Sequence, residues 1–131
     1  MQIYRLTEAA ALLGVSDDTV RRWADQGRFD ATTAVGGATG IAGPDLARLA
    51  TERANLEGAA TGPATTSARN RLRGIVTGVT RDTVMAQVEM CCGPYRVVSL
   101  MSREAADALD LEPGVLADAV IKATTVVVET P

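Results

Sequence analysis

Between residues 66 and 74 the chain reads Thr66-Ser67-Ala68-Arg69-Asn70-Arg71-Leu72-Arg73-Gly74, which places hydroxyls, a guanidinium and a carboxamide just before a predicted strand. A second stretch, Val120-Ile121-Lys122-Ala123-Thr124-Thr125-Val126, contains the single lysine of a chain that otherwise has twelve arginines. An ammonium group inside a β-branched apolar run is unusual for a purely solvated charge. Together the two stretches offer many hydrogen-bond donors and no carboxylate, a combination that suits a small oxyanion.

The order and separation of these motifs resemble the Mop, or molbindin, domain, a TOBE-type module that binds molybdate or tungstate. The resemblance extends from about Thr66 to Glu129 and rests on Ser-Ala-Arg-Asn, Leu-x-Gly and Ile-Lys-Ala-Thr in that order. It implies an oxyanion site made of Ser67, Arg69, Asn70, Lys122, Ala123 and Thr124. The residues allow two alternatives. In the first, Asn70 braces the turn that leads into the strand. In the second, the charged side chains bind no ligand: Arg69, Arg71 and Arg73 form a solvated face, and Lys122 extends to solvent at a sheet edge.

The chemistry of the donors predicts which anions such a site accepts. Molybdate, tungstate and sulfate are fully deprotonated at neutral pH and only accept hydrogen bonds, whereas phosphate keeps a proton part of the time. Since no Asp or Glu lies in 65–74 or 119–128, neither stretch offers that proton an acceptor. We therefore expect the site to favour these three anions, with phosphate bound much more weakly, and the resemblance implies molybdate or tungstate as the ligand.

Alternating apolar residues in the second half of the chain predict a small β domain. The expected strands are Leu72–Val79, Val84–Met90, Tyr95–Leu100, Leu116–Lys122 and Thr124–Glu129, with a short helix capped by Ser102 and ending near Leu109. Five strands and a helix in this length indicate an OB-like β-barrel, which the resemblance also implies. Mop relatives with one such domain form trimers of dimers that exchange strands and bind the anion between subunits, so the resemblance implies a homo-oligomer, a hexamer before a dimer.

The first part of the chain has a different character, so we expect an α+β protein of two small domains. Residues 1–56 predict helices around one hairpin, 57–66 a linker without any apolar residue larger than alanine, and 67–131 the Mop domain. Thr7 is a plausible N-cap for a helix that ends at Gly14 and carries Ala9, Leu12 and Leu13 on one face. Ser16 caps a second helix that runs to Gly27.

Two helices joined at Gly14-Val15 form a helix-turn-helix, and the stretch resembles the winged DNA-binding domain of MerR-like and excisionase-like proteins. We expect Val20, Trp23 and Ala24 to face the core, a hairpin with its tip near Gly36-Gly37, and a third helix from Asp45 to Leu56. The residues expected to contact double-stranded DNA are Thr19, Arg21, Arg22, Arg5 and Arg28. Ion pairing of Arg21 and Arg22 with nearby aspartates is the alternative.

Composition excludes several other classes of function. The net charge of −3 disfavours non-specific nucleic-acid binding by the whole molecule. With no histidine and two adjacent cysteines, Cys91 and Cys92, a metal-cation site is not expected; the cysteines are expected in a hairpin turn. No nucleophile motif or catalytic carboxylate pair indicates an enzyme. No apolar stretch approaches a membrane span and no signal peptide opens the chain, so we expect a cytoplasmic protein.

The leading hypothesis is therefore a molybdate- or tungstate-responsive, DNA-binding transcriptional regulator. The alternative is a molbindin-like storage or homeostasis protein whose helical domain serves assembly or protein interaction. Many winged relatives carry basic residues after the glycines at the wing tip, whereas this chain has Ala38-Thr39-Gly40 there. That difference keeps both hypotheses open.

Overall fold

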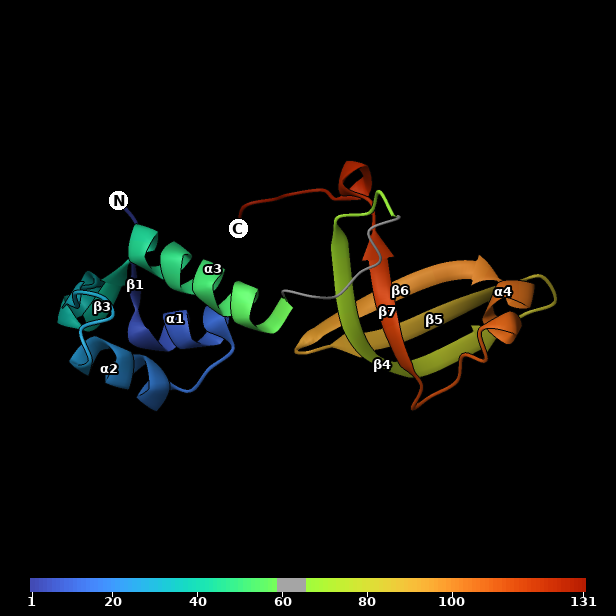
Figure 1. Cartoon of the computed structure of the whole chain (residues 1–131), viewed down its shortest axis with the longest axis horizontal. Coiled ribbons are helices and arrows are strands. Elements are labelled where there is room, and N and C mark those ends of the chain that lie inside the picture. Colours follow the sequence, from blue (N-terminus) through green and yellow to red (C-terminus); the bar gives the residue numbers. More distant parts are fainter. Residues whose placement is uncertain (59–65) are drawn as a thin grey trace. The chain divides into compact units, whose positions relative to one another are not determined.

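The computed structural model describes residues 1–58 and 66–131 of the chain (Figure 1). The chain divides into two compact units, Met1–Ala60 and Thr61–Pro131. Most of the linker expected at 57–66 lies outside the described residues. Its first two residues, 57 and 58, continue the third helix.

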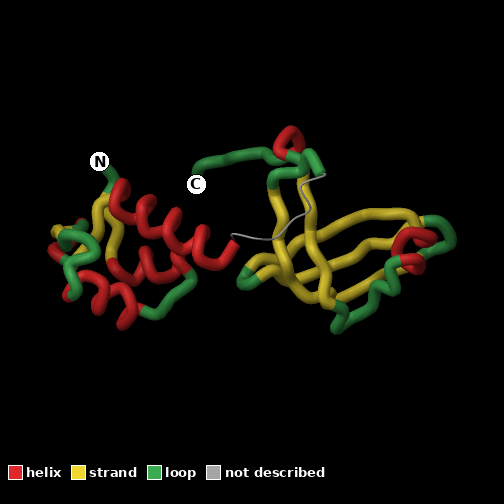
Figure 2. The backbone as a smooth tube through the Cα atoms, in the orientation of Figure 1, coloured by secondary structure: helices red, strands yellow, loops and turns green. Residues whose placement is uncertain are grey.

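The first unit combines three α-helices with a small antiparallel sheet of strand order β1-β3-β2 (Figure 2). Its elements are β1 (Ile3–Arg5), α1 (Leu6–Leu13), α2 (Asp17–Asp25), β2 (Thr32–Thr33), the 3-10 turn η1 (Val35–Gly37), β3 (Thr39–Ala42) and α3 (Gly43–Gly58). Gly14 ends α1 with φ of +68°, a left-handed conformation that glycine adopts without a steric penalty. The expected helix-turn-helix, followed by a hairpin wing and a third helix, is confirmed.

Local capping agrees with the sequence at α2 and differs at α1. The Ser16 hydroxyl accepts a hydrogen bond from the Thr19 backbone N–H at 3.2 Å, as expected for an N-cap. Helix α1 instead begins one residue before Thr7, with Arg5 at the N-cap position and no side-chain cap. The reason is that Arg5 also ends strand β1, which the sequence analysis missed, and the chain turns directly from strand to helix.

The core of the first unit is built on the predicted stripe of α2 and on both other helices. Val20 is fully buried, and Trp23 and Ala24 pack against the same cluster, as expected. Leu12, which was expected on one face of the helix with Ala9 and Leu13, is 61% exposed, whereas Ala10 is buried. The buried members of the cluster are Leu6, Ala9, Ala10, Leu13, Val20, Phe29, Ile41, Leu46 and Leu49.

The second unit is a four-stranded antiparallel sheet of order β6-β5-β4-β7 with one short helix at its end (Figure 1). Its elements are β4 (Asn70–Arg81), β5 (Met85–Cys92), β6 (Tyr95–Ser102), α4 (Arg103–Ala108), β7 (Leu116–Ile121) and the 3-10 turn η2 (Ala123–Thr125). Ser102 caps α4 as predicted, accepting a hydrogen bond from the Ala105 backbone N–H at 3.1 Å. Val76, Val88 and Leu111 form the centre of its core.

The strand predicted at Thr124–Glu129 is wrong, and the sheet is OB-like but not closed into a barrel. Residues 123–125 form η2, and no strand follows it in the described part of the chain. Val127 and Val128 are 82% and 86% exposed. Their β propensity is real, but a strand needs hydrogen-bonding partners, and none within the described residues of this chain pairs with them. Val84, the first residue of the strand expected at Val84–Met90, lies before β5 and is exposed.

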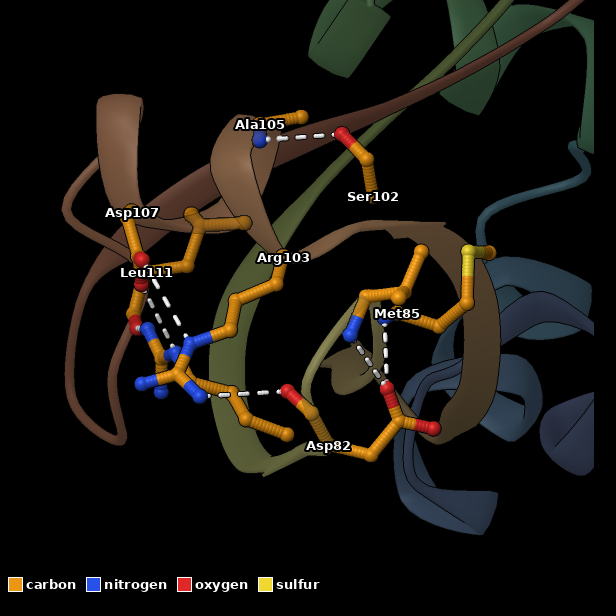
Figure 3. A network of polar contacts seen from close by, with 9 residues as sticks. Asp82, Met85, Ser102, Arg103, Ala105, Asp107 and Leu111 are labelled. Atoms are coloured by element: carbon orange, nitrogen blue, oxygen red, sulfur yellow. Dashed lines mark hydrogen bonds and ion pairs between the residues drawn. The ribbon is translucent and has the colours of Figure 1, made fainter.

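Hydrogen bonds of charged side chains join the turn between β4 and β5 to helix α4 (Figure 3). Asp82 Oδ1 accepts hydrogen bonds from the backbone N–H groups of Val84 and Met85, both at 2.7 Å, which hold the pKa of Asp82 below its usual value. Arg103 Nη1 donates to the Asp82 carbonyl at 3.1 Å, and Arg81 Nε donates to Asp107 Oδ1 at 2.9 Å. The β4–β5 turn is thereby fastened to α4.

The adjacent cysteines end strand β5 and do not form the turn itself, which is Gly93-Pro94. Cys91 is exposed, whereas Cys92 is buried and burial raises the pKa of its thiol. Strand β4 passes this point at Gly74, where a Cβ atom would overlap the Cys91 carbonyl oxygen and lie 2.8 Å from Cys92 Sγ. Glycine is therefore required for the close crossing of β4 and β5.

We expect Gly74→Ala to destabilise the second unit by about 2 kcal/mol, because an added methyl group must displace backbone atoms. Gly78→Ala, on the same strand with no atom within 4 Å of the added carbon, is the matched control and should change stability by less than about 0.5 kcal/mol. Urea unfolding followed by circular dichroism measures both. Equal stability of the two variants would contradict the steric argument.

Candidate functional site

The pairing of β4 with β7 brings the two donor-rich stretches together. Asn70, the first residue of β4, lies opposite Ile121, the last residue of β7, in an antiparallel register. Arg69 immediately precedes the one and Lys122 immediately follows the other, so both cations lie at the same end of the same strand pair. Figure 1 shows this end of the sheet, where β4 begins and β7 leads into η2. Segments about 50 residues apart in sequence thus form one surface.

The predicted residues on this surface take different structural roles. Asn70 Nδ2 donates to the Ile121 carbonyl at 3.1 Å, which corresponds to the bracing role considered from the sequence. Arg69 Nη1 donates only a long 3.4 Å hydrogen bond to the Thr66 carbonyl. The side chains of Ser67, Arg69, Lys122, Ala123 and Thr124 are exposed. Within the described residues, no carboxylate forms an ion pair with Arg69 or Lys122.

Two threonines outside the predicted set shape the backbone beside it. The Thr66 hydroxyl accepts a hydrogen bond from the Ala68 backbone N–H at 3.2 Å. The Thr125 hydroxyl donates to the Lys122 carbonyl at 2.8 Å and fixes the η2 turn. Their hydrogen bonds are local, and the tendency of Thr to bond its own backbone is the sequence signal that could have indicated them.

One carboxylate, which the sequence analysis did not single out, lies further along the same strand pair. Asp118 faces Arg73 in the β4–β7 register, and its Oδ1 and Oδ2 accept hydrogen bonds from Arg73 Nε at 2.9 Å and Nη2 at 3.3 Å. Arg71 Nη1 reaches Asp118 Oδ2 at 3.5 Å. The hydrogen bond from Arg73 is the main reason that the pKa of Asp118 lies below its usual value. The negative charge of Asp118 is therefore paired mainly with the guanidinium of Arg73.

An apolar hollow of the second unit borders this charged surface at strand β7, where Asp118 and Ile121 are part of its lining. A cavity of about 410 Å³ is lined mainly by aliphatic side chains, among them Val76, Val88, Met90, Met101 and Leu111. Its chemistry does not suit a small oxyanion, which needs donors. The predicted oxyanion residues thus form an open surface on the single chain.

The five predicted DNA-contacting residues are all in the first unit. Some of their side chains are exposed without an ion pair to a described residue, and others contact neighbouring residues of the unit. Arg21 and Arg22 are exposed on α2, and none of the described aspartates forms an ion pair with them. The Thr19 hydroxyl lies 2.9 Å from the Ser16 hydroxyl at the start of α2. Arg5 Nη2 donates to the Val35 carbonyl of the wing at 3.3 Å. Arg5 and Arg21 line one depression of about 270 Å³ together with Leu6, Thr7, Ala38 and Thr39.

Arg28 has internal partners and differs in this from Arg21 and Arg22. Its guanidinium carbon lies 4.5 Å from the centre of the Trp23 ring, and its Nη2 lies 3.1 Å from Glu52 Oε2 on α3. Arg48 in turn donates to the Arg28 carbonyl at 2.8 Å. These contacts connect the end of α2 with α3.

Other site types find no support in the described residues. No group of three or more His, Cys, Asp or Glu side chains among them could hold a metal ion. No helix among them is both long enough and apolar enough to cross a membrane.

Comparison with known proteins identifies both units. The family model for the TOBE domain matches residues 66–128, and that for a helix-turn-helix domain matches residues 3–54. A molybdate-binding protein from Sporomusa ovata is 32% identical, and the alignment covers 50% of this chain and 98% of that one, with a TM-score of 0.49. MopII from Clostridium pasteurianum is 31% identical over 50% of this chain and 100% of that one, with a TM-score of 0.47. None of the curated proteins matches.

We expect Arg28→Ala to lower the stability of the first unit by about 0.5 to 1 kcal/mol, because it removes the contacts with Trp23 and Glu52. Urea unfolding followed by Trp23 fluorescence measures the change. Arg22→Ala removes the same kind of side chain from an exposed position of α2 and should change stability by less than about 0.5 kcal/mol. An Arg28→Ala variant as stable as Arg22→Ala would mean that Arg28 does not hold the helices together.

Proposed function

We propose that the chain, which carries a helix-turn-helix domain ahead of a TOBE domain, is an intracellular molybdate- or tungstate-binding regulator of transcription. The observation that carries the proposal is the β4–β7 register, which sets Arg69 and Lys122 at one end of a strand pair. Both domain types are binding domains, and the proposal needs no catalytic step.

The proposed ligands of the oxyanion are the Ser67 and Thr124 hydroxyls, the Arg69 guanidinium, the Lys122 ammonium and backbone N–H groups near Asn70 and Ala123. All of these donate hydrogen bonds, and charge-assisted bonds of this kind stabilise a complex by about 1.5 to 3 kcal/mol each. The nearest carboxylate on the strand pair, Asp118, is occupied by Arg73. The site therefore favours an anion without a proton, which is the reason to prefer molybdate or tungstate over phosphate.

An open surface is a poor site for an oxyanion, because water competes for every donor. The exposure of Ser67, Arg69 and Lys122 in the single chain supports a site completed by a second copy. The exposed apolar residues Val127 and Val128, which have no strand partner among the described residues, support association as well. We propose a homo-oligomer, with a hexamer preferred over a dimer.

Double-stranded DNA is the proposed partner of the first unit, through Thr19, Arg21, Arg22 and Arg5, with Arg28 at the edge of the same surface. The free arginines of α2 and the depression beside the wing support this role. A specific observation favours the alternative of a storage protein whose helical unit serves assembly: the wing tip, Val35–Gly37 followed by Ala38 and Thr39, has no basic side chain for phosphate.

The sole lysine provides a test of the oxyanion site. Lys122→Ala should lower molybdate affinity at least tenfold, since it removes a full positive charge from a site made only of donors. Calorimetric titration with molybdate, tungstate, sulfate and phosphate, with light scattering for the oligomer, measures affinity and assembly together. Arg96→Ala removes one cation from the opposite edge of the same sheet, where Glu89 pairs with it at 2.6 Å, and should leave affinity unchanged. Unchanged molybdate binding in Lys122→Ala would refute the site.

A test of DNA binding separates regulation from storage. A double variant, Arg21→Ala with Arg22→Ala, should lose affinity for a mixed-sequence DNA duplex and keep its affinity for molybdate. The slope of log affinity against log salt should become shallower by about 0.9 for each phosphate contact removed. Lys122→Ala is the control and should bind DNA as the wild type does. Wild-type protein that binds molybdate at high stoichiometry but shows no salt-dependent DNA shift would favour storage.

A further inference from the structure

The β4–β7 strand pair carries more positive charge than the predicted oxyanion residues account for. Arg71 and Arg73 alternate with Leu72 on β4 and both contact Asp118 on β7, so they share one face of the sheet. Arg69 lies two residues before Arg71, immediately before β4 begins at Asn70. In the register, Arg71 faces Val120, between the Arg73–Asp118 pair and the end at which Arg69 and Lys122 lie. The four cations are Arg69, Arg71, Arg73 and Lys122. With the single carboxylate of Asp118 they carry a net charge of +3.

The single carboxylate does not neutralise the two arginines equally. Asp118 receives two hydrogen bonds from Arg73, at 2.9 and 3.3 Å, in the bidentate geometry that makes Arg–carboxylate pairs strong. Arg71 contributes a single contact at 3.5 Å, at the limit of a hydrogen bond. Most of the donors of Arg71 are therefore left for another acceptor.

Arg71 is also more enclosed than its neighbour. Its side chain is 20% exposed, whereas that of Arg73 is 62% exposed. A half-buried guanidinium with one weak partner is less well solvated than a surface arginine, so it gains more from an anion placed beside it. Two residues along a strand correspond to about 7 Å, so Arg71 lies next to the Arg69 end of the strand pair.

We propose that Arg71 is a third cationic residue of the oxyanion site and that it makes the site select doubly charged anions. This inference rests on the proposed function. Arg73 and Asp118 act as a neutral pair that occupies the nearest carboxylate and leaves Arg71 available. A third positive charge attracts a dianion twice as strongly as a monoanion of equal size, because Coulomb energy is proportional to the charge.

The test compares molybdate with perrhenate, a tetrahedral oxyanion of similar size that carries one negative charge. Calorimetric titration of the full chain gives both dissociation constants for the wild type and each variant. Arg71→Gln should weaken molybdate binding about tenfold and perrhenate binding about threefold, since half the Coulomb energy corresponds to the square root of the factor. Loss of a merely structural residue would weaken both anions by the same factor, and that result would overturn the inference.

Three further variants complete the experiment. Arg96→Gln removes a cation outside the site and should leave both dissociation constants unchanged. The double variant Arg73→Gln with Asp118→Asn removes the neutral pair without changing net charge and should keep molybdate affinity within about threefold. Arg71→Lys, which keeps the charge, should retain the wild-type preference for molybdate over perrhenate if the glutamine variant fails to fold. A lost preference in Arg71→Lys would overturn the inference.

Failure of the proposed function gives a different result. Wild-type protein that binds none of the oxyanions would overturn the proposed site and the inference together. Wild-type protein that binds molybdate, with Arg71→Gln indistinguishable from Arg96→Gln, would overturn the role of Arg71 alone.

Discussion

The antiparallel pairing of β4 with β7 is the constraint on which the second unit and its site depend. It sets the start of one strand against the end of another, and the Asn70 side chain adds a hydrogen bond to the Ile121 carbonyl at this end. A shift of one residue in this register would turn every side chain of β7 to the other face and separate Arg69 from Lys122. Gly74 allows β4 to maintain this pairing while it also passes close to β5 at Cys91 and Cys92. The charged surface is thus a consequence of backbone geometry.

Arginine supplies all but one of the side-chain cations in this protein, and the tertiary partners decide what each arginine does. Arg28 stacks on Trp23 and pairs with Glu52, so it contributes to the packing of the first unit. Arg73 and Arg81 pair with Asp118 and Asp107, respectively, and are likewise structural. Arg21, Arg22 and Arg69 are exposed and form no ion pairs within the described residues, which leaves them available to phosphate or an oxyanion. The overall charge of −3 says nothing about this division.

The C-terminal segment shows where prediction from local pattern fails. Thr124–Glu129 has the β-branched composition of a strand, yet residues 123–125 form a 3-10 turn and no strand follows within the described residues. Strand formation depends on a neighbouring strand with free backbone groups, and sequence composition does not reveal one. Leu12 is a similar case, since a helical stripe of apolar residues is broader than the face that α3 and the sheet cover.

The sequence by itself determined the two kinds of unit, the helix-turn-helix with its wing, most strands of the β domain, the Ser16 and Ser102 caps, and the two donor-rich stretches. These features depend on periodicity and capping, which act between residues close together in the chain. The tertiary structure decided which donors lie side by side, that Asp118 belongs to Arg73, that Arg71 remains largely unpaired, and that the sheet stays open. These features depend on strand register and on contacts between residues such as Arg71 and Asp118, which are 47 positions apart. No local pattern encodes distances of that kind, because they exist only after the strands have paired.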